Sequence, residues 1–309
     1  MKRFIVPLVT AAALAIPAAA NAELPSDIQA AIAKMGHVND PKTAPLFAPF
    51  HKAGIPADIK VTRDLAFGSD PAQKLDMFTS GQGTGKPILL YVHGGGFTRG
   101  DKHRPGEFMY DNVMVWAVKN GMVAAETNYR LAPQFKYPAA NDDVSASIKY
   151  IREHARDYGG DPNKIFVWGH SAGASLVGIY VSHPEFHYKQ GGGLIGAVMT
   201  SGGYEFRPNA FIADDATAKK ASSVEGLKAT KIPLFFTRAE WDPEVPQIAQ
   251  GEMIHKVLTE SGHDHFFHVM KTHNHMSQVY SVGTTEKQLT DLLGPWLKQH
   301  SANVKSASN

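Results

Sequence analysis

The sequence predicts an α/β protein with a mostly parallel central sheet and helices on both faces. Three observations support this prediction. From residue 87 to near the end of the 309-residue chain, apolar strand-like runs alternate with stretches of helical periodicity. One run, 87–92 (PILLYV), is continuously apolar, as is typical of a parallel strand buried on both faces. The third observation is residues 169–173 (GHSAG), a G-x-S-x-G pattern between a strand-like run and a helix-like run.

The first 22 residues have the composition of a secretory signal peptide. Lys2 and Arg3 give a charged start, residues 4–16 are largely apolar, and 20–22 (ANA) is a small-x-small cleavage signal. The apolar run is short for a membrane span, and no later stretch is long and apolar enough to cross a bilayer. We therefore expect export to the periplasm or the medium of a bacterium, with cleavage after Ala22. The chain has no cysteine, which excludes a cysteine nucleophile and thiolate metal ligands.

The charge of the chain is balanced. It has 31 basic and 29 acidic residues, and Lys2 and Arg3 lie in the expected signal peptide. This balance predicts no nucleic-acid partner and no anionic membrane partner. The length suits one catalytic domain, expected over residues 61–300, followed by a disordered tail, 301–309. The segment 23–60 is either a cap over the site or a structural extension, and the oligomeric state is not indicated.

The first part of the domain leads to a glycine-rich loop. Residues 61–67 and 74–78 are expected to pair as a hairpin at the sheet edge, before the central strand 87–92. That strand runs into 93–97 (HGGGF), where three glycines let the backbone approach a ligand with its N–H groups exposed. A loop that binds an oxyanion belongs at this end of a central strand. His93 is expected to fix the loop by hydrogen bonding rather than to act as a base.

Residues 105–158 are expected to alternate helix and strand and to supply no catalytic residue. Residues 105–120 are expected to form a helix, 122–128 a strand and 139–158 a long helix. Arg130 and the acidic pair 142–143 lie around the start of the long helix. We expect these charges to cap that helix or to form a buried brace.

Ser171 is the candidate nucleophile. Its turn is too tight for side chains two residues away, so glycine stands on both sides, and the serine is held in a strained conformation above the sheet edge. The backbone N–H of Ala172, at a helix N-terminus, would point at an oxyanion bound beside Ser171. A plain strand-to-helix turn with a capping serine would have the same pattern, so the rest of the chain must show whether Ser171 is catalytic.

Two later loops supply an acid and a histidine. Strands are expected at 193–200, 232–237 and 265–270, and helices at 247–261 and 285–299. Asp242 follows the second of these strands, although Asp242-Pro243 is also a common helix start. Glu240 and Glu244 are the other acids nearby. The loop 273–275 (HNH) follows the last strand.

Serine, aspartate and histidine thus follow in that order, each just after a strand, so they would meet at one sheet edge. A serine hydroxyl needs a base within hydrogen-bond reach, imidazole can serve as that base, and the acid fixes its tautomer.

In combination the motifs resemble the α/β-hydrolase superfamily, in particular serine esterases of the hormone-sensitive-lipase-like and acetyl-esterase (carboxylesterase) group. The resemblance implies Ser171 as nucleophile, Asp242 as acid and His275 as base, with an oxyanion hole from the N–H groups of Gly95, Gly96 and Ala172. It also implies hydrolysis of small-molecule carboxylic esters, such as short-chain acyl, acetyl or feruloyl esters, without a cofactor or a metal. The motifs that carry it are 93–97 (HGGGF), 128–133 (NYRLAP), 138–143 (PAANDD), 160–162 (GDP), 169–173 (GHSAG), 242–243 (DP) and His275.

Three alternatives stay open. The family's histidine is commonly followed by Gly or Phe, whereas Met276 follows here, so His273 competes with His275 as the base. The same machinery serves arylformamidases, which makes an amide substrate the alternative to an ester. Finally, His263-x-His265 and His273-x-His275 could bind a metal on a strand. No carboxylate pattern completes such a metal site, and it would leave the G-x-S-x-G turn unexplained.

Overall fold

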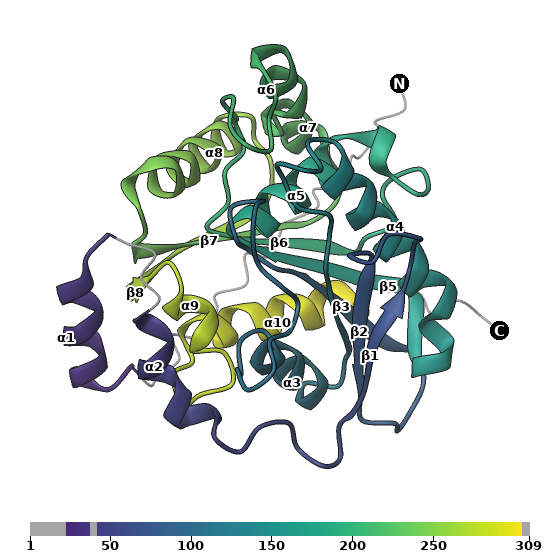
Figure 1. The fold of residues 1–309 in the computed structure, drawn as a ribbon, viewed down its shortest axis with the longest axis vertical. Coiled ribbons are helices and arrows are strands. Elements are labelled where there is room, and N and C mark those ends of the chain that lie inside the picture. The colour runs from purple at the N-terminus through teal and green to yellow at the C-terminus, as the bar shows by residue number, and fades with distance from the viewer. Residues whose placement is uncertain (1–22, 38–41, 305–309) are drawn as a thin grey trace, which may run out of the picture.

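The computed structural model describes residues 23–37 and 42–304, so the expected signal peptide, 1–22, lies outside the described residues. The fold is built on one eight-stranded sheet with the order β1-β2-β4-β3-β5-β6-β7-β8 (Figure 1). β1 and β2 form the expected antiparallel hairpin at one edge, β2 is antiparallel to β4, and all other neighbours are parallel. The predicted α/β class is confirmed. The strands are β1 Lys60–Ala66, β2 Lys74–Thr79, β3 Lys86–Val92, β4 Val123–Thr127, β5 Gly160–His170, β6 Gly196–Thr200, β7 Leu234–Trp241 and β8 His265–Asn274.

Helices cover both faces of the sheet. α4, α5 and α8 lie on one face with α6 and α7 beyond them, and α3 and α10 lie on the other (Figure 1). None of the helices in the described ranges combines the length and apolar composition of a bilayer span. The helices are α1 Ser26–Met35, α2 Thr43–Phe47, α3 Asp111–Lys119, α4 Ala139–His154, α5 Ala172–Ser182, α6 Asp215–Ala221, α7 Val224–Ala229, α8 Ala249–Glu260, α9 Ser277–Tyr280 and α10 Gln288–Ala302.

β3 shows why a continuous apolar run is needed at the centre. Ile88, Leu90 and Val92 pack into the core under α4, α5 and α8, whereas Leu89 and Tyr91 pack into the core under α3 and α10. Successive side chains of a strand point to opposite faces, so a strand covered on both faces must be apolar at every position. All five side chains are fully buried. Because β3 and β5 to β8 are parallel, the loops after them gather at one edge of the sheet.

The expected helix over 105–120 is shorter in the structure. α3 begins only at Asp111, because Gly106 (φ 82°) and Tyr110 (φ 68°) lie in the left-handed region, which an α-helix excludes. Phe108 therefore does not share a helix face with Val113. Instead it stacks on His51, with ring centroids 4.4 Å apart.

Other boundaries differ from expectation by a few residues. α8 starts at Ala249 rather than 247, because Val245 is extended (φ −130°, ψ 129°) and interrupts the turn before it. α10 runs from Gln288 through Ala302, so the first two residues of the expected tail are helical. The rest of that tail from 305 onwards lies outside the described residues.

The described residues of the segment 23–60, which are 23–37 and 42–60, pack beside the carboxyl edge of the sheet. Leu24, Ile28, Ile32 and Phe47 form a small core with Tyr280. His37 Nδ1 donates a 2.8 Å hydrogen bond to the backbone oxygen of Asp242. No described residue of this segment lines the cavities that contain Ser171. The described part of the segment therefore supports the site from the side.

Candidate active site

Ser171 lies on a strained turn between β5 and α5. Its backbone has φ 56° and ψ −121°, a conformation that non-glycine residues rarely adopt and that must be imposed by the surroundings. A Cβ on Gly169 would lie 2.3 Å from the oxygen of Gly173, and one on Gly173 would lie 2.1 Å from the oxygen of Val92. Only glycine fits at either position. The strained serine conformation predicted from the sequence is confirmed.

Asp242 and His275 form a buried hydrogen-bonded pair. Asp242 follows β7 and His275 follows β8, and His275 Nδ1 lies 2.6 Å from Asp242 Oδ1. The other carboxylate oxygen of Asp242 accepts hydrogen bonds from Ser201 Oγ (2.5 Å) and Ala239 N (2.7 Å). The helix-cap alternative for Asp242 is wrong, because its carboxylate receives no hydrogen bond from the turn that follows. These three bonds hold the carboxylate rigidly against the imidazole.

His273 and the two neighbouring acids take no part in this pair. His273 is fully buried, with Nδ1 3.0 Å from Ser277 Oγ and Nε2 3.7 Å from Glu286. Glu240 accepts hydrogen bonds from Lys271 and from the backbone of Thr272. Of the histidines and acids that the sequence left in competition, the structure brings together His275 and Asp242.

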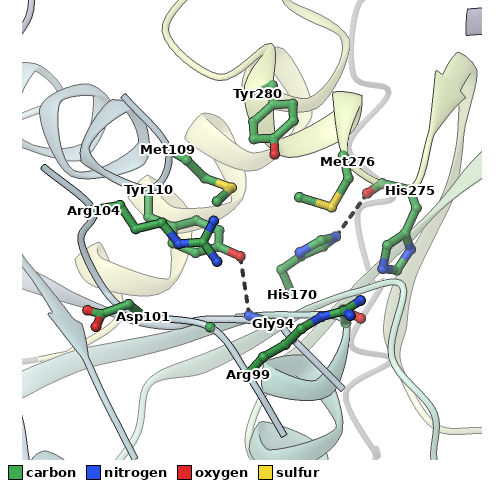
Figure 2. Close-up of a pocket in the computed structure, with 13 residues that line it drawn as sticks. Gly94, Arg99, Asp101, Arg104, Met109, Tyr110, His170, His275, Met276 and Tyr280 are labelled. Carbon is green, nitrogen blue, oxygen red and sulfur yellow. Dashed lines mark hydrogen bonds between the residues drawn. The ribbon is translucent and has the colours of Figure 1, made fainter. Parts of the chain in front are cut away.

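Ser171 lies where two cavities meet. The smaller, of about 310 Å³, is also lined by Gly94, Gly95 and His275 (Figure 2). The larger, of about 800 Å³, is also lined by Gly96 and Ala172. Within the described chain, Ser171 Oγ forms no hydrogen bond with His275, as is common for a serine and its base before substrate binds.

The glycine-rich loop presents free backbone donors beside Ser171. Gly95 (φ 120°) and Gly96 (φ 62°) have left-handed conformations, and the oxygen of Gly95 accepts hydrogen bonds from Thr98 N and Arg99 N, which close the turn. No described residue accepts a hydrogen bond from the N–H groups of Gly95, Gly96 or Ala172. These are the three donors expected from the sequence, and they remain available for a ligand.

His93 holds this loop, as expected. Its Nδ1 donates a 2.6 Å hydrogen bond to the oxygen of Gly94, and its ring stacks on Tyr129 at 4.4 Å. Burial lowers the pKa of His93 to about 4, so the ring is neutral at physiological pH. Tyr129 donates its hydroxyl to the backbone oxygen of His93. The ring and the backbone oxygen of His93 thus both make contacts that hold the glycine-rich loop in place.

Sequence reasoning missed three residues that position the pair. His170 Nε2 donates to the backbone oxygen of His275 (2.9 Å), and burial holds the pKa of His170 well below its usual value (Figure 2). Gln278 Nε2 donates to the same oxygen (3.1 Å) and to Ser201 Oγ (2.6 Å). Ser201 carried one signal in the sequence, since it directly follows β6, between the strands that precede Ser171 and Asp242. Nothing in the spacing marked His170 or Gln278.

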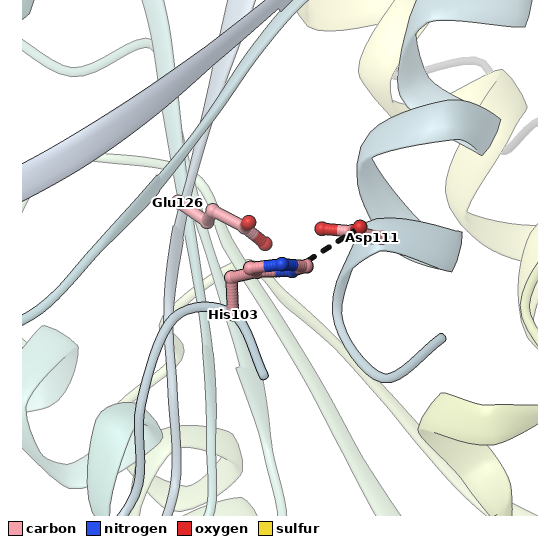
Figure 3. A group of neighbouring side chains, drawn as sticks. All are labelled: His103, Asp111 and Glu126. Carbon is pink, nitrogen blue, oxygen red and sulfur yellow. Dashed lines mark ion pairs between the residues drawn. The ribbon is translucent and has the colours of Figure 1, made fainter. Parts of the chain in front are cut away.

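Among the described residues, one group has the spacing of a metal site. His103, Asp111 and Glu126 have ligand atoms within 4.8 Å of one another (Figure 3). However, Arg63 already donates to Asp111 (2.8 Å) and Glu126 (2.8 Å), and also to Asp76 (2.7 Å). Burial and the nearby acids Asp111 and Asp76 raise the pKa of Glu126 well above its usual value. The group is an ion network centred on Arg63. The two His-x-His pairs form no such group in the described ranges.

Removing the guanidinium of this network should destabilise the fold. Arg63→Met would leave Asp76, Asp111 and Glu126 buried without their shared cation, and breaking a buried pair in this way costs about 3–5 kcal/mol. Urea denaturation followed by circular dichroism measures this loss. Arg156→Met, at an exposed arginine outside the network, should change the free energy of unfolding by less than about 0.5 kcal/mol. Equal stability of the two variants would contradict the role given to Arg63.

Comparisons with known proteins show which proteins the chain resembles. Residues 75–188 match the BD-FAE family model. The carboxylesterase NlhH of Mycobacterium tuberculosis is 37% identical over 95 residues, which cover 30% of this chain and 28% of that protein. The curated relatives reported for this chain match over about a fifth to about half of their own lengths.

Solved structures match over more of the chain. Esterase B from Lactobacillus rhamnosis superposes with a TM-score of 0.70 at 16% identity, covering 89% of this chain and 94% of that one. An esterase of the bacterial hormone-sensitive lipase family has a TM-score of 0.65 at 17% identity, covering 90% and 100%. The chain therefore has the α/β-hydrolase fold. Together the matches confirm the expected resemblance to the hormone-sensitive-lipase-like esterases.

Proposed function

We propose that the protein hydrolyses small-molecule carboxylic esters through an acyl-enzyme, without a metal or a cofactor. One arrangement of residues around Ser171 is the main support for this proposal. His275, hydrogen-bonded to the buried Asp242, lines the same cavity as Ser171, beside backbone donors that no described residue pairs. The carboxylesterases and esterases among the matched proteins support it.

The reaction follows from the geometry. His275 Nδ1 is bound to Asp242, which leaves Nε2 to accept the proton of Ser171 as its oxygen attacks the ester carbon. The negative charge on the carbonyl oxygen is then stabilised by the N–H groups of Gly95, Gly96 and Ala172. His275 returns the proton to the leaving alcohol, which departs and leaves an acyl-serine. A water molecule, deprotonated by His275, attacks the acyl-serine and releases the acid and free Ser171.

A substrate panel tests the proposal. Purified protein would be assayed on 4-nitrophenyl esters of increasing acyl length, an acetylated xylo-oligosaccharide, a feruloyl ester and a formylated arylamine. We expect the protein to hydrolyse the esters. In a separate experiment, we expect a fluorophosphonate to label Ser171. Faster turnover of the formylated arylamine than of every ester would replace the ester assignment with the amide alternative. Turnover that a chelator abolishes would overturn the metal-free mechanism.

We also propose that the protein is exported and cleaved after Ala22. The support is the charged start, the apolar run and the small-x-small signal of residues 1–22, together with a cysteine-free composition. Expression of the full chain in a bacterial host, fractionation and intact-mass measurement test this. A periplasmic or secreted protein that begins at Glu23 is expected. A cytoplasmic protein that retains the first 22 residues would contradict the proposal.

A further inference from the structure

The two cavities that meet at Ser171 have different roles in the proposed reaction, on which this inference rests. His275 must pass a proton to the leaving alcohol, so the alcohol half of an ester lies on the side of His275. His275 lines the smaller cavity, which we name the alcohol-side cavity. Gly96 and Ala172 line the larger one without His275, and we name it the acyl-side cavity.

Two arginines face the alcohol-side cavity. In Figure 2, Arg99 and Arg104 extend from the loop after β3 toward the space in front of His170 and His275. The side chain of Arg99 forms no ion pair or hydrogen bond with any described residue. Arg104 has only Glu107 as a counterion, at 3.7 Å, and both side chains are about half exposed. Two guanidinium groups thus face this cavity, and that of Arg99 has no counterion among the described residues, while that of Arg104 has one half-exposed counterion, Glu107.

One carboxylate, Asp101, shares this cavity but is engaged elsewhere. Its Oδ1 accepts hydrogen bonds from His103 N (3.1 Å) and Asn128 Nδ2 (3.2 Å). With two guanidinium groups against one carboxylate, the wall of the cavity carries net positive charge when His275 is neutral. A planar guanidinium matches a carboxylate better than it matches an uncharged hydroxyl group.

The remaining walls suit a compact organic group. Met109 and Met276 supply apolar contacts, and the Tyr280 hydroxyl points into the space between them (Figure 2). Burial raises the pKa of Tyr110 to about 12, so its hydroxyl stays protonated beside Gly94 N. A cavity of about 310 Å³ is at the small end of ligand sites.

The acyl-side cavity has the opposite character. Phe97, Phe206 and Met253 give it an apolar lining, and its charged residues, Glu205 and Arg207, are of opposite sign. Net charge is therefore concentrated on the alcohol side of Ser171.

We propose that the preferred substrates are esters whose alcohol half carries a carboxylate, bound by Arg99 and Arg104. The substrate class is an uncharged acyl group esterified to a small hydroxycarboxylate. Arg99 and Arg104 select the substrate and take no part in the chemical step.

A matched pair of esters tests this selection. 4-Acetoxybenzoate carries the carboxylate, and 4-acetoxybenzamide is its uncharged isostere with the same acetyl group. The measured quantity is the ratio of kcat/KM for the acid to kcat/KM for the amide. We expect the wild-type ratio to exceed that of Arg99→Gln/Arg104→Gln by about tenfold or more, the value of a charge-assisted hydrogen bond. Comparing ratios between proteins cancels the different intrinsic reactivity of the two esters.

Control variants locate the effect. Arg99→Lys/Arg104→Lys should retain part of the preference, which salt should weaken. Arg207→Gln, in the acyl-side cavity, and Arg156→Gln, outside both cavities, should leave the ratio unchanged. A second pair, mono-4-nitrophenyl glutarate and 4-nitrophenyl butyrate, places the carboxylate in the acyl half, and its ratio should not depend on Arg99 or Arg104.

The outcomes separate the two proposals. A ratio that is the same in wild type and the double glutamine variant, while both esters are hydrolysed, would overturn the anionic-alcohol inference and leave the esterase assignment intact. A ratio that responds to Arg207→Gln instead would also overturn it. Turnover of neither ester above the level of Ser171→Ala would mean that the proposed function itself has failed.

Discussion

Ser171→Ala is expected to lower kcat for ester hydrolysis by about 10⁴-fold or more. The variant loses the only oxygen at the strained turn between β5 and α5 that can form the acyl-enzyme. The backbone donors of Gly95, Gly96 and Ala172 remain, so substrate should still bind and a small residual rate should persist. Steady-state kinetics on the best ester of the panel measure the loss.

Fluorophosphonate labelling followed by mass spectrometry separates lost chemistry from lost folding. Wild type should acquire one label at Ser171 and the variant none, while both should have the same thermal midpoint. Ser171 is nearly buried and its Oγ holds no part of the core together, so alanine should be tolerated. Undiminished ester turnover by a folded Ser171→Ala protein would show that another nucleophile, or a metal-bound water, attacks the ester carbon.

His275→Ala should approach the loss seen for Ser171→Ala, whereas His273→Ala should retain most activity. His275 is the histidine that Asp242 orients, and without it no group takes the proton of Ser171. His273 faces Ser277 and Glu286 instead. Measuring kcat/KM for both variants under identical conditions makes this comparison.

Stability provides the second readout for the histidines. His273 is fully buried, so its replacement with alanine leaves a cavity and removes the imidazole that lies 3.0 Å from Ser277 Oγ, at a cost of about 1–3 kcal/mol. We therefore expect His273→Ala to be less stable but active, and His275→Ala to be inactive. If His273→Ala were the inactive variant at a temperature where it is folded, the base would have to be reassigned to His273.

The sequence by itself determined the architecture and most of the site. The apolar run 87–92 predicted a strand covered on both faces, and the strand–helix alternation after it predicted a parallel sheet, both of which the structure has. The glycines of 169–173 and 93–97 could be interpreted locally, because a tight turn and an exposed backbone donor are properties of a few consecutive residues. The order of strands then placed the loops after β5, β7 and β8 at one edge.

Only the tertiary structure decided which side chains meet across that edge. His273 and His275 are two residues apart, and the path of the chain from β8 into α9 directs His275 at Asp242 and His273 at Ser277. Sequence spacing could not show which histidine is the base, because that choice depends on the hydrogen bond to Asp242, a residue from a distant segment.

The positioning bonds of His170, Ser201 and Gln278, and the ion network around Arg63, were invisible for the same reason. Apart from the local bond of Gln278 to the oxygen of His275, these bonds join segments far apart in the chain. A single sequence records the residues of such a network without recording which of them are neighbours. The start of α3 was decided by two residues, Gly106 and Tyr110, whose left-handed conformations depend on how the loop packs over the site. Local patterns thus specify elements and turns, whereas contacts between distant segments specify the partners of each polar side chain.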